Sequence, residues 1–174
     1  MILDFNRLIR YLAYTLELLV LFMIQETPGL LPEVFGTRPV LVLPAGLTMA
    51  MFEEETPAMA FGIAAGLLCD FGYSGVLGFH GLLLGVLCFF LSLLVRTYLQ
   101  VSWLTALLAV ILAIGLLIGG QWLCFYFFRY SMPGYALRHH YLPKYLYTLL
   151  FVPLLYLLNK GLADTLQGQD KQNF

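Results

Sequence analysis

The chain contains very little charge. Lys, Arg, Asp and Glu make up 11% of its 174 residues, and the formal net charge is −1. Hydrophobic residues make up 61%, and the mean hydropathy is +0.86, whereas a soluble domain is roughly 45–50% apolar. Because so few charges cannot cover a water-facing surface, the apolar runs are predicted to face lipid or one another.

The chain also lacks the clusters that mark several function classes. It has no long Lys/Arg run, which excludes nucleic acid as a partner because phosphate binding needs clustered cations. It has no serine-nucleophile elbow, HExxH motif or phosphate loop, so we expect neither an enzyme nor a cofactor. Cys69, Cys88 and Cys124 stand singly in apolar runs and are predicted to be buried thiols. Arg138-His139-His140 has no convergent third ligand, so no metal site is expected there and we interpret it as an interfacial loop.

The apolar residues fall into six segments that predict one all-α integral membrane domain over residues 1–174. A bilayer core of about 30 Å needs about 20 mostly apolar residues per helix, with shorter spans where the bundle thins the membrane. Arg7 and Arg10 before an uncleaved first helix favour cytoplasmic termini by the positive-inside rule. The hydrophilic tail, residues 162–174, is expected to fray in the cytoplasm. The predicted membrane helices cover residues 8–25, 39–52, 57–71, 77–95, 102–128 and 141–161.

An acidic turn separates the second and third segments. Thr56-Pro57 is predicted to be the N-cap and first residue of the third helix, since proline lacks the donor that this position leaves unused. Glu53-Glu54-Glu55 would then lie beside the positive end of the helix dipole. We interpret these residues as a solvated turn, in preference to a docking site.

Small residues predict close helix packing in the third to fifth segments. The third helix has a stripe at i, i+4 spacing, and Gly-x-x-x-Gly pairs follow in the next two helices. Such faces let helix backbones approach closely in lipid. The third-helix stripe, or an equivalent face on the first helix, is the predicted docking face for a partner helix, and a homo-oligomer through a glycine face stays open. The residues are Ala58, Gly62, Gly66 and Asp70, then Gly81 and Gly85, then Gly115 and Gly119.

Three polar side chains stand out against this apolar background. Asp70, followed by a glycine-rich turn, could accept hydrogen bonds from the amides of its own turn or pair with His80, and both alternatives stay open. His80 is interpreted as an interhelical hydrogen-bonding group. Glu17 lies in the middle of the first helix, where a carboxylate is costly, so it is predicted to face the bundle or a partner helix.

The region from Arg38 to Arg96 has a distinctive order of motifs: an Arg-Pro pair after the first loop, a Gly-rich third helix that ends in Leu-Leu-x-Asp, and a glycine turn that leads into the fourth helix. The residues are Arg38, Pro39, Gly62, Gly66, Leu67, Leu68, Asp70, Gly75, Gly78 and His80. This pattern resembles the rod shape-determining protein MreD family of bacteria. The resemblance covers about a third of the chain specifically and the rest only by length and helix count. The chain departs from the family's pattern at Val40 and at the acidic turn Glu53-Glu54-Glu55, which suggests a divergent member.

The resemblance implies a non-catalytic scaffold of the cell-elongation machinery in the bacterial inner membrane. Its expected partners would be MreC and, through it, MreB, RodA and a penicillin-binding transpeptidase, together with membrane lipids. The family's fold is similar to the substrate-binding S-component of energy-coupling-factor vitamin transporters.

That similarity provides an alternative function of another class, capture of a vitamin. An S-component would need a pocket formed by the first loop and the outer helix ends, with polar groups that converge on a small ligand. Glu26, Glu33 and Arg38 could serve in such a pocket. The loop is apolar and rich in proline, however, which favours the scaffold.

Overall fold

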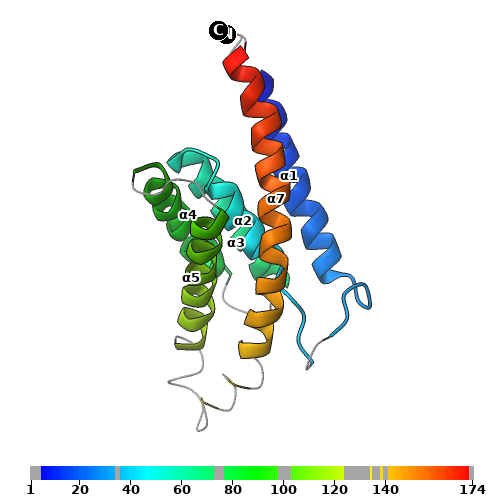
Figure 1. Ribbon diagram of the computed structural model, residues 1–174. Coiled ribbons are helices and arrows are strands. Elements are labelled where there is room, and N and C mark those ends of the chain that lie inside the picture. The colour runs from blue at the N-terminus through cyan, green and yellow to red at the C-terminus, as the bar shows by residue number, and fades with distance from the viewer. Residues whose placement is uncertain are drawn as a thin grey trace.

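The described residues are entirely helical apart from turns and connections, as Figure 1 shows. The computed structural model describes residues 5–33, 36–72, 77–97, 103–123, 134, 138 and 141–172. The prediction of an all-α fold is confirmed for this part of the chain. Its helices, in order, are α1 (Phe5–Glu26), α2 (Val42–Ala50), α3 (Glu55–Gly72), α4 (Phe79–Thr97), α5 (Trp103–Trp122) and α7 (Leu142–Gln172).

Three of these helices are long and apolar enough to cross a membrane. The candidate spans are Asn6–Glu26 in α1, Phe79–Thr97 in α4 and Leu142–Thr165 in α7. A shorter apolar helix covers Leu107–Trp122 within α5. The architecture is therefore consistent with a helical membrane protein.

α2 lies at the centre of the molecule, and all nine of its residues are buried. It contacts α1, α3, α4, α5 and α7. A helix of this length extends only about 14 Å, which is half of a bilayer core. The prediction of a membrane helix over residues 39–52 was therefore too long. Pro44 is tolerated because it lies in the first turn, where the backbone N–H has no intrahelical acceptor. Gly46 lets α3 approach closely, since a Cβ there would lie 3.0 Å from the Cβ of Ala65.

α1 presents one face to the rest of the protein and the other to its surroundings. Its buried side chains, Arg10, Tyr14, Glu17, Leu18 and Gln25, repeat at helical spacing. Large apolar side chains cover the opposite face, which in a membrane would face lipid. They are Leu8, Leu12, Leu16, Leu19, Val20 and Met23.

α3 begins at Glu55, so Thr56 is not its N-cap as predicted. The amide of Ala58 donates to the carbonyl of Glu54 over 2.9 Å, which closes the first turn earlier than expected. Pro57 still lies in the first turn, where its missing N–H costs nothing.

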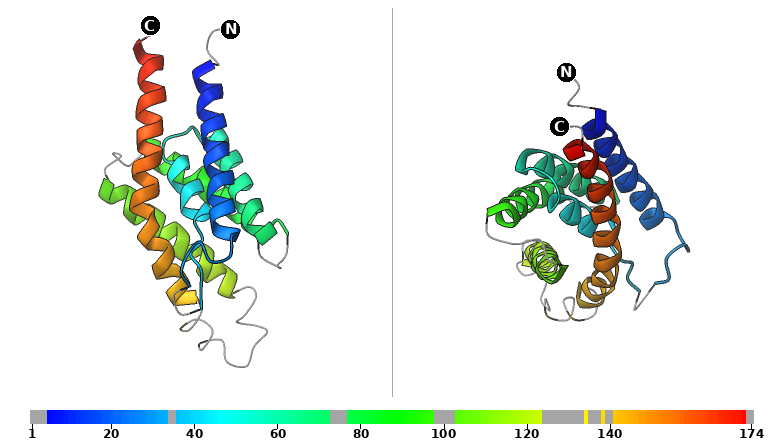
Figure 2. Two further views of the ribbon diagram at one scale, coloured as in Figure 1. Left: turned by 90° about the vertical axis from the view of Figure 1, so that its right-hand side faces the viewer. Right: turned by 45° about the horizontal axis from the view of Figure 1, so that its top comes forward.

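α7 continues as a helix to Gln172, although residues 162–174 were expected to fray. Ala163, at 1% exposure, is packed inside the protein and anchors the helix beyond the predicted end. Figures 1 and 2 show that the start of α1 and the end of α7 extend beyond the other helices at the same end of the molecule. Of the predicted fifth segment, residues 124–128 lie outside the described residues.

Candidate functional site

The α3–α4 hairpin is the region that contains most of the residues singled out from the sequence. A Cβ atom at Gly66 would lie 2.6 Å from the Cα of Gly81 and closer still to the carbonyl of His80. A Cβ at Gly62 would lie 2.8 Å from the Cβ of Cys88. Real Cβ atoms do not approach neighbours so closely, so these glycines allow the two helices to touch along their backbones.

The α4 side of the same contact is equally tight. A Cβ at Gly85 would lie 2.5 Å from Cγ1 of Ile63, and one at Gly81 would lie 3.1 Å from Cγ of Leu67. Ala58 in the same α3 stripe is fully buried. The stripe is thus a packing face, as predicted, but it is used inside the protein. Because it is not exposed, it cannot be the docking face for a partner helix.

Asp70 fixes the hairpin by capping the start of α4. Its carboxylate accepts hydrogen bonds from the amides of Gly78, His80 and Gly81 over 2.8, 3.2 and 3.3 Å. Nδ1 of His80 also lies 2.6 Å from the carboxylate. Amides at a helix N-terminus have no intrahelical acceptor, and the dipole there favours an anion. Both alternatives for Asp70, local amides and His80, therefore occur together.

Gly78 has a positive φ of 96°, a conformation that favours glycine. This conformation lets the chain enter α4 directly under the carboxylate of Asp70. Gly75, the other glycine predicted for this turn, lies outside the described residues.

The acidic turn is not solvated throughout, which corrects the sequence interpretation. Glu53 is buried at 4% exposure and forms an ion pair with Arg10 of α1, with one N–O distance of 3.0 Å. Burial raises the pKa of Glu53, and the guanidinium of Arg10 opposes this shift. The interpretation failed because it treated Arg10 as a flanking charge, whereas α1 turns this side chain inward.

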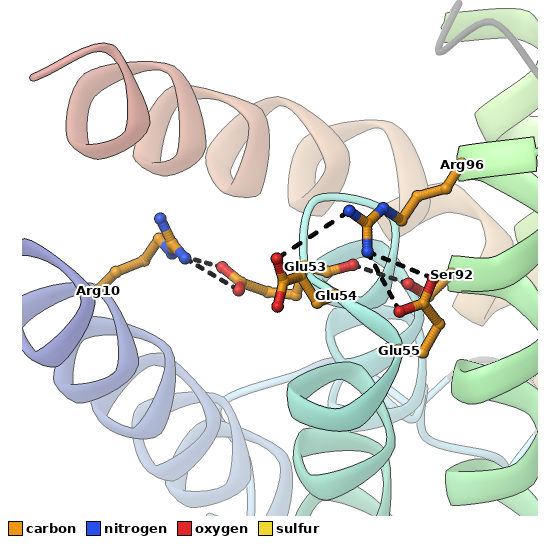
Figure 3. Close-up of polar contacts among 6 residues, drawn as sticks. All are labelled: Arg10, Glu53, Glu54, Glu55, Ser92 and Arg96. Atoms are coloured by element: carbon orange, nitrogen blue, oxygen red, sulfur yellow. Dashed lines mark hydrogen bonds and ion pairs between the residues drawn. The ribbon is translucent and has the colours of Figure 1, made fainter. Parts of the chain in front are cut away.

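The same turn is tied to α4 on its other side (Figure 3). The hydroxyl of Ser92 donates to the carbonyl of Glu53 over 2.7 Å. Arg96 lies 3.1 Å from Glu55 and 4.0 Å from Glu54, with half of its side chain exposed. The acidic turn therefore connects α1 to α4, with a buried pair on one side and an exposed cluster on the other.

Glu17 faces the bundle, one of the two orientations predicted for it. Its Oε1 accepts a hydrogen bond from Nδ2 of Asn159 in α7 over 3.1 Å. Asn159 also donates to Oγ1 of Thr48 in α2 over 3.0 Å. The three side chains form a polar network in which α1, α2 and α7 meet, and none is more than 9% exposed.

The loop between α1 and α2 covers a polar pocket of about 260 Å³. Glu26, Glu33 and Arg38, the residues considered for ligand recognition, all line it. Arg38 lies in an exposed ion pair with Glu33 at 2.8 Å, and Pro39 lines the pocket beside it. The remaining lining residues are Gln25, Gly36, Thr37, Gly72 and Lys144, of which Lys144 is buried at 7% exposure.

Several polar positions were not identified from the sequence. Gln25 accepts hydrogen bonds from the amides of Leu41 and Val42, which begin α2. Asn159 and Lys144 were overlooked as well. Each lies within or beside a long apolar run, as Glu17 does, but Gln25 and Asn159 are each followed by a charged residue, which makes the signal weaker than at Glu17.

Cys69 and Cys88 are buried free thiols, as predicted, whereas Cys124 lies outside the described residues. Among the described residues, no three His, Cys, Asp or Glu side chains come together as metal ligands. Comparison with protein-family models, with curated proteins and with solved structures gave no significant match.

Proposed function

We propose that this protein is a non-catalytic scaffold of the bacterial rod-shape machinery that binds MreC in the inner membrane. The observation that supports this proposal is the α3–α4 hairpin. This hairpin contains residues that carry the MreD resemblance. They form the close backbone contact between α3 and α4 and the cap at the start of α4, and they include Gly62, Gly66, Asp70, Gly78 and His80. A rigid hairpin of this kind suits a protein that holds partner helices in place.

The partner would bind outside the hairpin stripe, because that stripe is already occupied by α4. The sequence also suggested the first helix as a docking face. The exposed apolar face of α1, which includes Leu12 and Leu16, is available in this structure. We further propose an S-component-like arrangement of these helices with both termini in the cytoplasm, in which α2 is a short buried helix rather than a full membrane crossing.

Co-purification of the tagged chain from its native membranes tests the scaffold proposal. We expect mass spectrometry to recover MreC together with wall synthases, and the variant Leu16→Trp to reduce this recovery because it changes the proposed docking face. The matched control is Leu112→Trp, at an exposed position of α5. Recovery of an ATPase pair and a membrane coupling subunit in place of MreC would contradict the scaffold.

A second function, capture of a vitamin as an S-component, is favoured by the polar pocket under the first loop. The pocket contains charged groups of both signs, as recognition of a small polar molecule requires. A thermal-shift screen with vitamins tests this alternative. Specific stabilisation that is lost in Arg38→Ala would support capture and contradict a scaffold-only function, whereas no shift with any vitamin would count against capture.

A further inference from the structure

Glu17 is a buried carboxylate without a cationic partner. It is 9% exposed, and no Lys, Arg or His of the described residues forms an ion pair with it. Its hydrogen bond to Asn159 comes from a neutral amide. The second carboxylate oxygen, Oε2, is buried and accepts no hydrogen bond from the described residues.

An ionised carboxylate in these surroundings would be costly. Removal of a charge from water costs much more, even after relaxation, than one hydrogen bond from a neutral amide returns. By comparison, the buried carboxylate of Glu53 is compensated by the guanidinium of Arg10, near the start of α1. Glu17 has no equivalent of Arg10 in the part of the chain that the structure describes.

A bound proton would remove this imbalance. The neutral acid carries no charge, and it donates one hydrogen bond in addition to those it accepts. Oδ1 of Asn159 is a second buried oxygen without a hydrogen-bond donor. Two buried oxygens of the network, Oε2 of Glu17 and Oδ1 of Asn159, therefore receive no hydrogen bond. A proton on Glu17 would add one donor and reduce this excess of acceptors.

We propose that Glu17 is a proton-binding site and that it holds α1 against α2 and α7 as the neutral acid at neutral pH. The proposal does not depend on the scaffold function. Since the folded state would bind a proton that the unfolded chain releases at neutral pH, stability should fall as the pH rises.

Few other titratable groups lie near Glu17, and the comparison of the wild type with Glu17→Gln separates their contribution from that of Glu17. α2 contributes no titratable side chain. Tyr14, one turn before Glu17 on α1, and Tyr156, one turn before Asn159 on α7, contribute phenol groups and no carboxyl or amino group. Glu53 lies further along the bundle in its pair with Arg10, and Lys160 is exposed.

Thermal unfolding of the full chain in detergent between acidic and alkaline pH tests the proposal. We expect the wild type to lose stability as the pH rises, and Glu17→Gln to match the wild type at neutral pH with a weaker pH dependence. Asp164→Asn, which changes an exposed acid on α7, is the control and should keep the wild-type profile. Parallel profiles for wild type and Glu17→Gln would overturn the proposal.

Infrared spectroscopy provides a second readout, which does not depend on unfolding. A protonated carboxylic acid has a C=O stretching band separate from carboxylate bands, and we expect one buried acid at neutral pH that Glu17→Gln lacks. If instead only carboxylate bands are present and added Na⁺ raises the unfolding temperature of the wild type alone, Glu17 would be a cation site and the proton proposal would be wrong.

Discussion

The α3–α4 hairpin and α1 are attached to the protein by different kinds of contact. α3 and α4 meet where glycines bring backbones together, at Gly62, Gly66, Gly81 and Gly85. α1 is instead held by polar side chains along one face, where Arg10, Glu17 and Gln25 reach three different elements. In lipid the hydrophobic effect does not drive helices together, so close fit and polar contacts are the two available means of association.

The difference indicates which part of the molecule can respond to its environment. A glycine contact depends on shape, so it should be insensitive to pH and salt, and the titratable side chains Asp70 and His80 of the hairpin lie only at its turn. The contacts of α1 contain buried charged or ionisable side chains, and burial of such a side chain destabilises the fold unless the correct partner is present. The position of α1 therefore depends on charged or ionisable groups along its length, whereas in the hairpin such groups are confined to the turn at Asp70 and His80.

The buried ion pair should give the largest effect. Arg10→Leu leaves Glu53 buried without its cation, and loss of one member of a buried pair costs about 3–5 kcal/mol. We expect this loss in the free energy of unfolding, measured by denaturation in mixed micelles. The control is Arg96→Leu, whose exposed pairs with Glu54 and Glu55 should contribute no more than about 1 kcal/mol.

A double variant separates charge burial from simple loss of contact. In Arg10→Leu combined with Glu53→Leu, no uncompensated charge remains, so most of the stability should return. If the double variant were as unstable as Arg10→Leu alone, the pair would matter for shape rather than charge, and the contrast between α1 and the hairpin would disappear.

The second prediction concerns the glycine contact. Gly66→Ala places a methyl group against the backbone of α4, and overpacking of this kind costs about 1–3 kcal/mol or more. The control is Gly119→Ala, because a Cβ there meets nothing within 4 Å. The control should be neutral or stabilise α5 by up to about 1 kcal/mol through helix propensity. Equal unfolding free energies for the two variants would mean that α3 and α4 can move apart to admit the added methyl group at little cost.

The glycine hairpin could be predicted from the sequence because its signal is local. Gly62, Gly66 and Asp70 fall at helical spacing on one side of a turn, and Gly78 and His80 follow on the other. Chain connectivity alone brings the two sides together. The sequence did not show that the stripe would be buried inside the protein, with none of it left for a partner.

The attachments of α1 could not be predicted in the same way, because their partners are far apart in sequence. Asn159 lies 142 residues from Glu17, and Glu53 lies 43 residues from Arg10. Apolar periodicity shows that a polar residue must face inward but not which partner it meets. The buried position of α2 was missed for a related reason, since a helix apolar on all sides has the same composition in a core as in lipid.

The third prediction concerns the cap of α4. Asp70→Ala removes the acceptor for three amides and for Nδ1 of His80, and loss of a cap costs about 0.5–2 kcal/mol. Asp70→Asn keeps one acceptor oxygen and should lose less. We expect the order wild type, Asn, Ala in unfolding temperature. An alanine variant as stable as the wild type would show that glycine packing alone holds the hairpin.

The smallest effect is expected at the exposed pair of Arg38 and Glu33. Both side chains are well exposed, at 39% and 52%, so solvent screens their attraction, and a double-mutant cycle with Arg38→Ala and Glu33→Ala should give a coupling of no more than about 1 kcal/mol. The same cycle at Arg10 and Glu53 should give a larger coupling, because that pair is buried. A large coupling at Arg38 would mean that the loop closes over the polar pocket more tightly than its exposure indicates. In that case the loop would behave as a lid, and the vitamin-capture alternative would gain over the scaffold.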